Sequence, residues 1–133
     1  MAKLIPFIFS EDARAQAEFY AGALGGEIQS VMTHGQAPEP VEGHQDKVMH
    51  LCLSAAGVTF FMADSPDALS RGNGLSLNLE FGTAEEGREA FTNLSAGGRV
   101  IHEYKPVFWG GLYGWLEDRY GVRWMISSPG EAG

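Results

Sequence analysis

Apolar and polar residues alternate in short segments of the chain, and this two-residue period predicts β-strands. Residues 75–81, for example, read LSLNLEF. Elsewhere the apolar residues recur at helical spacing, between Ala13 and Leu24 and again around Phe91 and Leu94. The pattern therefore predicts strands and helices within one chain.

Each predicted helix starts after acidic or capping residues and ends at two glycines. Glu11–Asp12 precede the first helix, and Thr83 precedes the second with Glu85–Glu86 in its first turn. The glycine pairs are Gly25–Gly26 and Gly97–Gly98, which are typical of helix C-termini.

The chain also repeats itself. EFYAGALGGEI (18–28) aligns with AFTNLSAGGRV (90–100) at a shift of 72 residues, from 19 to 91. LSAAGVTFFMAD (53–64) aligns with EDRYGVRWMISS (117–128) at a shift of 64, from 57 to 121. The difference indicates a longer loop in the first half, which we assign to residues 33–47.

Each half is then predicted to contain a strand, a helix and three more strands. The expected strands are 4–9, 28–33, 48–54 and 58–63 in the first half, and 75–81, 99–107, 112–117 and 122–127 in the second. We expect a single domain over residues 1–133, with one module at about 1–64, a connector at 65–74 and a second module at about 75–133.

Composition excludes several classes of partner. The net charge is −8 with only nine Lys and Arg, so we expect no nucleic acid to bind. No apolar run approaches the roughly 20 residues that span a bilayer, and we expect no membrane partner. Cys52 is the single cysteine and its neighbours are apolar, which favours a buried, inert thiol and a cytoplasmic location.

The duplicated βαβββ pattern, the FY pair before GG and the late D-x-x-G turn together resemble the vicinal oxygen chelate superfamily. PFIF, KVMHLCL and FWGGLYGWLEDRYGVRWMI resemble its PhnB-like branch, over nearly the whole chain. The resemblance implies an α+β fold of two βαβββ modules that form a curved, cup-shaped mixed sheet with helices outside. It also implies a homodimer. Members often carry a demethylubiquinone methyltransferase label, but no Gly-rich strand-to-helix turn suited to a methyl-donor nucleotide is present.

Superfamily enzymes hold a divalent metal through His and Glu on the first and last strands of each module. The matching positions in this chain are residues 4–6, Phe61, Ser76 and Met125. These side chains do not suit a hard metal, so we predict no metal and no other cofactor. A divalent metal at other positions is the alternative.

Strand parity predicts which side chains face the concave side of the sheet. Trp124 should face the helices, with Arg123 and Met125 on the opposite side. The sequence D-R-Y-G predicts a turn of three residues after Asp118, which should pair Glu117 with Arg123. The predicted ligand-binding set is Phe61, Ser76, Asn78, Glu80, Trp109, Tyr113, Trp115, Arg123 and Met125.

In this set the rings would enclose a ligand, and Arg123 would bind a carboxylate or phosphate-like group. Glu80 and Glu117 are candidates for a general acid or base. In the alternative interpretation, Glu117 and Arg123 form a cross-strand ion pair and the rings are core or dimer surface. We expect His50 to pack toward the helix, and His102 to share a strand face with Tyr104.

Three functions remain open. The first is a binder of small molecules that needs no metal, with an unidentified ligand. The second is a lyase or isomerase that uses glutamate acid–base chemistry or an atypically placed metal. The third is a non-catalytic structural or regulatory dimer. Whether the protein is an enzyme is left open, because a fold alone does not define an activity.

Overall fold

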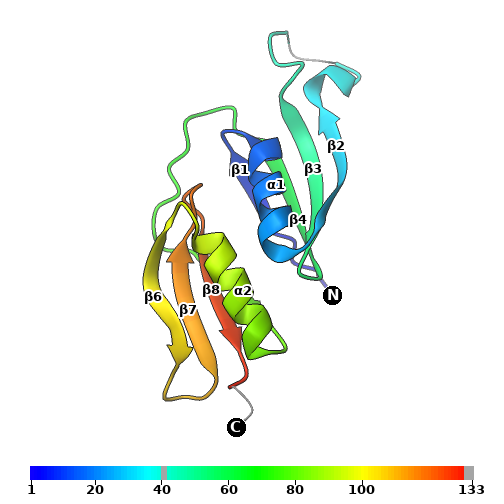
Figure 1. The fold of residues 1–133 in the computed structure, drawn as a ribbon. Coiled ribbons are helices and arrows are strands. Elements are labelled where there is room, and N and C mark those ends of the chain that lie inside the picture. The colour runs from blue at the N-terminus through cyan, green and yellow to red at the C-terminus, as the bar shows by residue number, and fades with distance from the viewer. Residues whose placement is uncertain (40–41, 131–133) are drawn as a thin grey trace. The chain divides into compact units, whose positions relative to one another are not determined.

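The computed structural model describes residues 1–39 and 42–130 and divides into two compact units, Met1–Ser70 and Arg71–Gly133. Each unit has the same order of elements, a strand, a helix and three strands, as the internal repeat predicts (Figure 1). Part of the long loop predicted at 33–47 lies outside the described residues, at positions 40 and 41.

The first unit is a four-stranded mixed sheet with one α-helix. Its elements are β1 (Phe7–Ser10), α1 (Ala13–Leu24), β2 (Glu27–Thr33), a short 3-10 helix η1 (His34–Gln36), β3 (Val48–Ala55) and β4 (Val58–Asp64). The strand order is β1-β4-β3-β2, and only the β1–β4 pair is parallel. The first strand is shorter than the predicted 4–9 because its ladder with β4 begins at Phe7.

The second unit repeats this topology. Its elements are β5 (Leu77–Glu80), α2 (Ala84–Ser95), β6 (Arg99–Pro106), β7 (Leu112–Glu117) and β8 (Arg123–Ser128). The strand order is β5-β8-β7-β6, with β5 parallel to β8 and the other pairs antiparallel. The two mixed sheets and two helices confirm the predicted α+β class.

Both helices are capped where the sequence predicts. The Asp12 carboxylate accepts from the Ala15 amide at 3.1 Å, and the Thr83 hydroxyl accepts from the Glu86 amide at 3.1 Å. Gly25 ends α1 in the left-handed conformation, with φ of 69°. After α2 the left-handed residue is Gly97, with φ of 78°.

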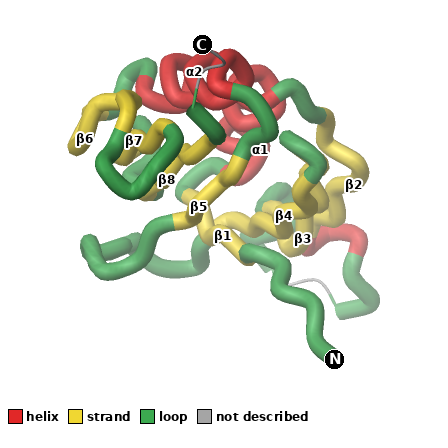
Figure 2. Tube along the Cα trace, turned by 90° about the horizontal axis from the view of Figure 1, so that it is seen from below, coloured by secondary structure: helices red, strands yellow, loops and turns green. Residues whose placement is uncertain are grey.

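Within each unit the helix covers one face of its own sheet (Figure 2). The largest fully buried side chains of the second unit are Leu94, Leu116, Trp124 and Ile126, and those of the first include Tyr20, Leu51, Leu53, Phe60 and Met62. Because side chains alternate along a strand, each sheet also has a second face that its helix does not cover. We call this the open face.

Candidate functional site

The open face of the second sheet holds most of the predicted site residues. Along β7 the burial alternates, with Leu112 and Leu116 buried on the α2 side and Tyr113 and Trp115 half-buried on the open side. Along β8, Trp124 is fully buried, as the parity of the strand predicts. The side chains of this open face from β5 through β8 include Ser76, Asn78, Glu80, Tyr113, Trp115, Glu117, Arg123, Met125 and Ser127.

The hairpin between β7 and β8 sets this register. The Asp118 amide donates to the Val122 carbonyl at 2.8 Å, and the Gly121 amide donates to the Asp118 carbonyl at 3.0 Å. Gly121 is left-handed, with φ of 84°. Glu117 consequently pairs with Arg123, so the predicted three-residue turn is confirmed.

The Trp115 ring is fixed by contacts on two sides. Its Nε1 donates to the Ser76 hydroxyl at 3.0 Å, which ties β7 to the residue just before β5. The Arg123 guanidinium lies 5.4 Å from the centroid of the same ring, within the range of a cation–π contact. The open face therefore carries an ordered indole surface beside a fixed cation.

Glu117 lies between two arginines. Its Oε1 is 3.2 Å from Arg123 Nε, and its Oε2 is 3.4 Å from Arg99 Nε. The Arg123 side chain is only 13% exposed, whereas that of Arg99 is 58% exposed. The cross-strand ion pair that the sequence allowed as an alternative is thus present, and a ligand would have to use the terminal nitrogens of Arg123.

Trp109 extends the aromatic surface from the loop between β6 and β7. Its ring contacts Tyr113 edge-on, with centroids 5.8 Å apart, and it also contacts Phe108 at 5.0 Å. Trp109 is 64% exposed and Phe108 is 97% exposed. Gly110 and Gly111 both have positive φ, so glycine is needed at this bend.

The remaining polar residues of the set lie toward the β5 edge of the face. Asn78 pairs with Met125, and its Oδ1 is 3.5 Å from the Ser127 hydroxyl. Glu80 pairs with Ser127 and is exposed. Met125 is half-buried between Trp115 and Asn78 in the same cross-strand row.

His102 also belongs to this face, contrary to the sequence prediction that it shares a side with Tyr104. The β6–β7 ladder has register shifts on both sides of His102. As a result, His102 pairs with Trp115 and contacts the Tyr113 ring at 5.2 Å, while Tyr104 packs against Phe91 of α2. A β-bulge changes the alternation locally, which strict parity cannot anticipate.

The open face of the first sheet carries a separate aromatic cluster. Phe61, a predicted site residue, contacts His50 at 4.6 Å and Phe7 at 6.4 Å between ring centroids. Phe7 and Phe9 are each nearly half exposed, and their rings lie 5.0 Å apart. Phe61 is therefore placed on an open face as predicted, but within a different unit from the other eight residues of the set.

The prediction that His50 packs toward the helix is wrong. The β3–β4 turn contains two residues, Ala56 and Gly57, whereas the β7–β8 turn contains three. The alignment of the two halves of the sequence ignores this difference and therefore displaces β3 by one residue. Such a displacement assigns every side chain of the strand to the opposite face. His50 thus corresponds to Tyr113 and lies on the open side.

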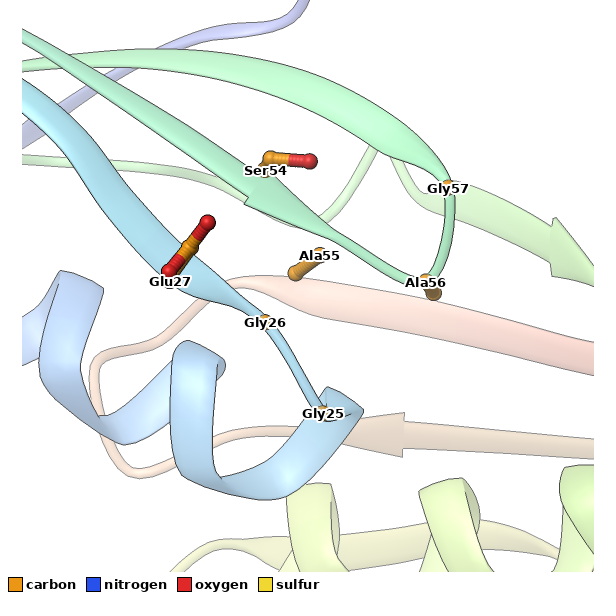
Figure 3. Close-up of a pocket in the computed structure, with 7 residues that line it drawn as sticks. All are labelled: Gly25, Gly26, Glu27, Ser54, Ala55, Ala56 and Gly57. Carbon is orange, nitrogen blue, oxygen red and sulfur yellow. The ribbon is translucent and has the colours of Figure 1, made fainter.

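A hollow of about 330 Å³ lies elsewhere in the first unit (Figure 3). It is lined by Gly25, Gly26, Glu27, Ser54, Ala55, Ala56 and Gly57. Figure 3 shows the Glu27 and Ser54 side chains on neighbouring strands, near the end of α1 and the β3–β4 turn. No residue of the predicted ligand-binding set lines this hollow.

The superfamily metal positions do not fit a divalent metal in this chain. Phe61 has no donor atom, Ser76 already accepts from the Trp115 indole, and Met125 offers only a thioether. Hard divalent cations are bound mainly by carboxylate and carbonyl oxygen atoms, and zinc by imidazole, thiolate or carboxylate groups. In residues 1–39 and 42–130, no three His, Cys, Asp or Glu side chains are grouped to hold a metal ion.

Comparisons with known proteins agree with this fold. The sequence model of the 3-demethylubiquinone-9 3-methyltransferase family matches residues 2–127. Protein YjdN of Escherichia coli K12 is 26% identical over 137 residues, which cover 93% of each chain.

No helix in the described part of the chain is long and apolar enough to cross a membrane.

Three solved structures extend the comparison. Protein PA1353 from Pseudomonas aeruginosa has a TM-score of 0.85 at 26% identity, over 98% of this chain and 100% of that one. The PhnB protein from Bacillus cereus has a TM-score of 0.77 at 25% identity, over 96% and 99% of the two chains. The fosfomycin resistance protein FosX from Listeria monocytogenes has a TM-score of 0.68 at 12% identity, over 96% and 93%, and shares the fold alone.

Proposed function

The chain belongs to the 3-demethylubiquinone-9 3-methyltransferase family, and we propose that it is a PhnB-like member of the vicinal oxygen chelate superfamily that binds a small planar organic anion. The site is the open face of the second sheet. The observation that carries this proposal is the Trp115 ring, which Ser76 and Arg123 hold in place. A fixed ring beside a guanidinium group suits a planar ligand with a negatively charged group.

The charge on this face supports an anionic ligand. The paired residues of the open face include three cations, Arg99, Lys105 and Arg123, and two carboxylates, Glu80 and Glu117. The whole chain, in contrast, has a net charge of −8. Cations thus outnumber carboxylates here, which favours the approach of an anion.

Arg123→Gln should weaken the binding of benzoate, used as a probe, about tenfold, because a charge-assisted hydrogen bond to the carboxylate is lost. Isothermal titration calorimetry measures the change in Kd. The matched control is Arg88→Gln, because the Arg88 guanidinium also lies over a ring of this unit, that of Tyr104 on the α2 side, at 5.7 Å. No binding by the wild-type protein, or equal losses in both variants, would contradict the proposal.

We also propose that the protein functions without a metal at the superfamily positions. The side chains there, Phe61, Ser76 and Met125, do not offer the donor atoms that a divalent metal needs. Protein purified without chelator should then contain divalent metal only at substoichiometric levels, as measured by inductively coupled plasma mass spectrometry. One equivalent of a divalent metal per chain would contradict this and would favour the metal-dependent enzyme.

The exposed rings of Phe108 and Trp109 support the homodimer that the sequence resemblance implies, because large exposed apolar side chains often mark interfaces. Multi-angle light scattering should give twice the chain mass of 14.4 kDa. Phe108→Ser should shift the mass toward one chain. A monomeric wild-type protein would rule out this assembly.

A further inference from the structure

His102 is the histidine of the open face on the second sheet, and the proposed function above assigns it no task. Its Nδ1 atom is buried and has no hydrogen-bond partner within residues 1–39 and 42–130. Its ring packs against Tyr113 with centroids 5.2 Å apart. It pairs across β6 and β7 with Trp115, the indole at the centre of the proposed site.

The burial of Nδ1 determines where the proton of a neutral imidazole resides. A proton on Nδ1 would create a buried N–H donor without an acceptor, which is more costly than a bare nitrogen lone pair in an apolar setting. The proton therefore favours Nε2. This tautomer turns the other ring nitrogen of His102 into a hydrogen-bond donor.

The strand order separates this donor from Arg123. His102 lies on β6 and Arg123 on β8, with Trp115 on β7 between them. Strands in a sheet are spaced about 4.8 Å apart, so β6 and β8 are separated by roughly 10 Å, and Arg123 lies two residues further along, opposite Glu117. A planar ligand over Trp115 would have the Arg123 guanidinium on one side and the His102 ring on the other.

We propose that His102 contacts the ligand and donates a hydrogen bond from Nε2 to an oxygen atom of the bound anion. This inference rests on the proposed binding function and narrows the ligand class. The ligand is an aromatic carboxylate, or a similar planar anion, that carries a second oxygen atom away from its charged group.

The test compares 4-hydroxybenzoate with benzoate, which lacks the second oxygen atom. His102→Phe keeps a ring against Tyr113 and removes the donor. It should weaken 4-hydroxybenzoate about fivefold by calorimetry and leave benzoate unchanged. His102→Gln, which retains an N–H donor, should restore part of the loss. His44→Phe, in an exposed segment of the first unit, is the control and should change neither affinity.

A second measurement reads the tautomer directly. Long-range ¹H–¹⁵N correlation spectra should show that His102 carries its proton on Nε2 in the protein without ligand. A proton on Nδ1 would overturn the inference, as would equal effects of His102→Phe on the two probes. If neither probe binds the wild-type protein, the proposed function itself fails. If benzoate binds and 4-hydroxybenzoate is insensitive to His102, only the role of His102 fails.

Discussion

Replacing Asp118 with alanine should lower the free energy of unfolding by about 3 kcal/mol, because it leaves a buried N–H donor without its acceptor. Asp118 is only 3% exposed. Its Oδ2 accepts from the Trp124 indole at 2.8 Å, and its Oδ1 accepts from the amides of Tyr120 and Val122. A single carboxylate thus stabilises the turn and the central core residue of the second unit.

Thermal or denaturant unfolding, followed by the fluorescence of buried Trp124, measures this effect, and the melting temperature should fall by roughly 10 °C. Asp46→Ala is the control, because Asp46 is exposed and should change the stability little. Asp118→Asn should also destabilise the protein, because its amide group cannot satisfy all the donors that the carboxylate accepts from. If Asp118→Ala were as stable as Asp46→Ala, the buried network would contribute nothing.

Gly98→Ala should destabilise the second unit by about 3 kcal/mol through steric overlap with the backbone of the β7–β8 hairpin. A Cβ at Gly98 would lie 2.2 Å from the Glu117 carbonyl oxygen and 2.9 Å from the Asp118 Cα. Neither atom belongs to a flexible side-chain end, so the backbone would have to move. The shift would act on Glu117, and through it on the ion pair with Arg123.

Gly26→Ala should act similarly in the first unit, where a Cβ would lie 2.1 Å from the Ser54 carbonyl oxygen. Gly22→Ala is the matched control. Gly22 lies within α1, and a Cβ at this position would meet no neighbouring element within 4 Å. This change should raise the stability by about 0.5–1 kcal/mol, since alanine is the better helix former. Circular dichroism melts of the three variants separate the outcomes, and a Gly98→Ala protein as stable as wild type would refute the steric argument.

These glycines show how much of the fold the sequence encoded. The repeated pairs were predicted to end the helices, and the first glycine of each pair does adopt the left-handed conformation at or just beyond a helix end. The second glycine has another role. Because it has no Cβ, Gly26 can lie close to β3 and Gly98 can lie close to the β7–β8 hairpin. A sequence pattern marks such a position but does not identify the neighbouring backbone.

The candidate site was predicted less completely than the fold. Parity and turn type correctly placed Tyr113, Trp115 and Arg123 on one face, because β7 and β8 are regular strands joined by a recognisable turn. The same method misplaced His50 and His102. His50 lies on β3, which is joined to β4 by a turn one residue shorter than the β7–β8 turn. His102 lies between two register shifts. When an inserted or missing residue is not recognised, parity assigns every following residue of the strand to the wrong face.

The two-module α+β architecture, the limits of most elements and the face that each regular strand presents could all be predicted from the order of residues, because these features depend on local periodicity and capping. The contacts of the polar groups became known only from the folded chain. Glu117 is the partner of two arginines, Ser76 fixes Trp115, and irregular pairing brings His102 onto the open face. Such contacts join residues far apart in the chain, and their geometry depends on strand register, which a one-dimensional pattern does not specify.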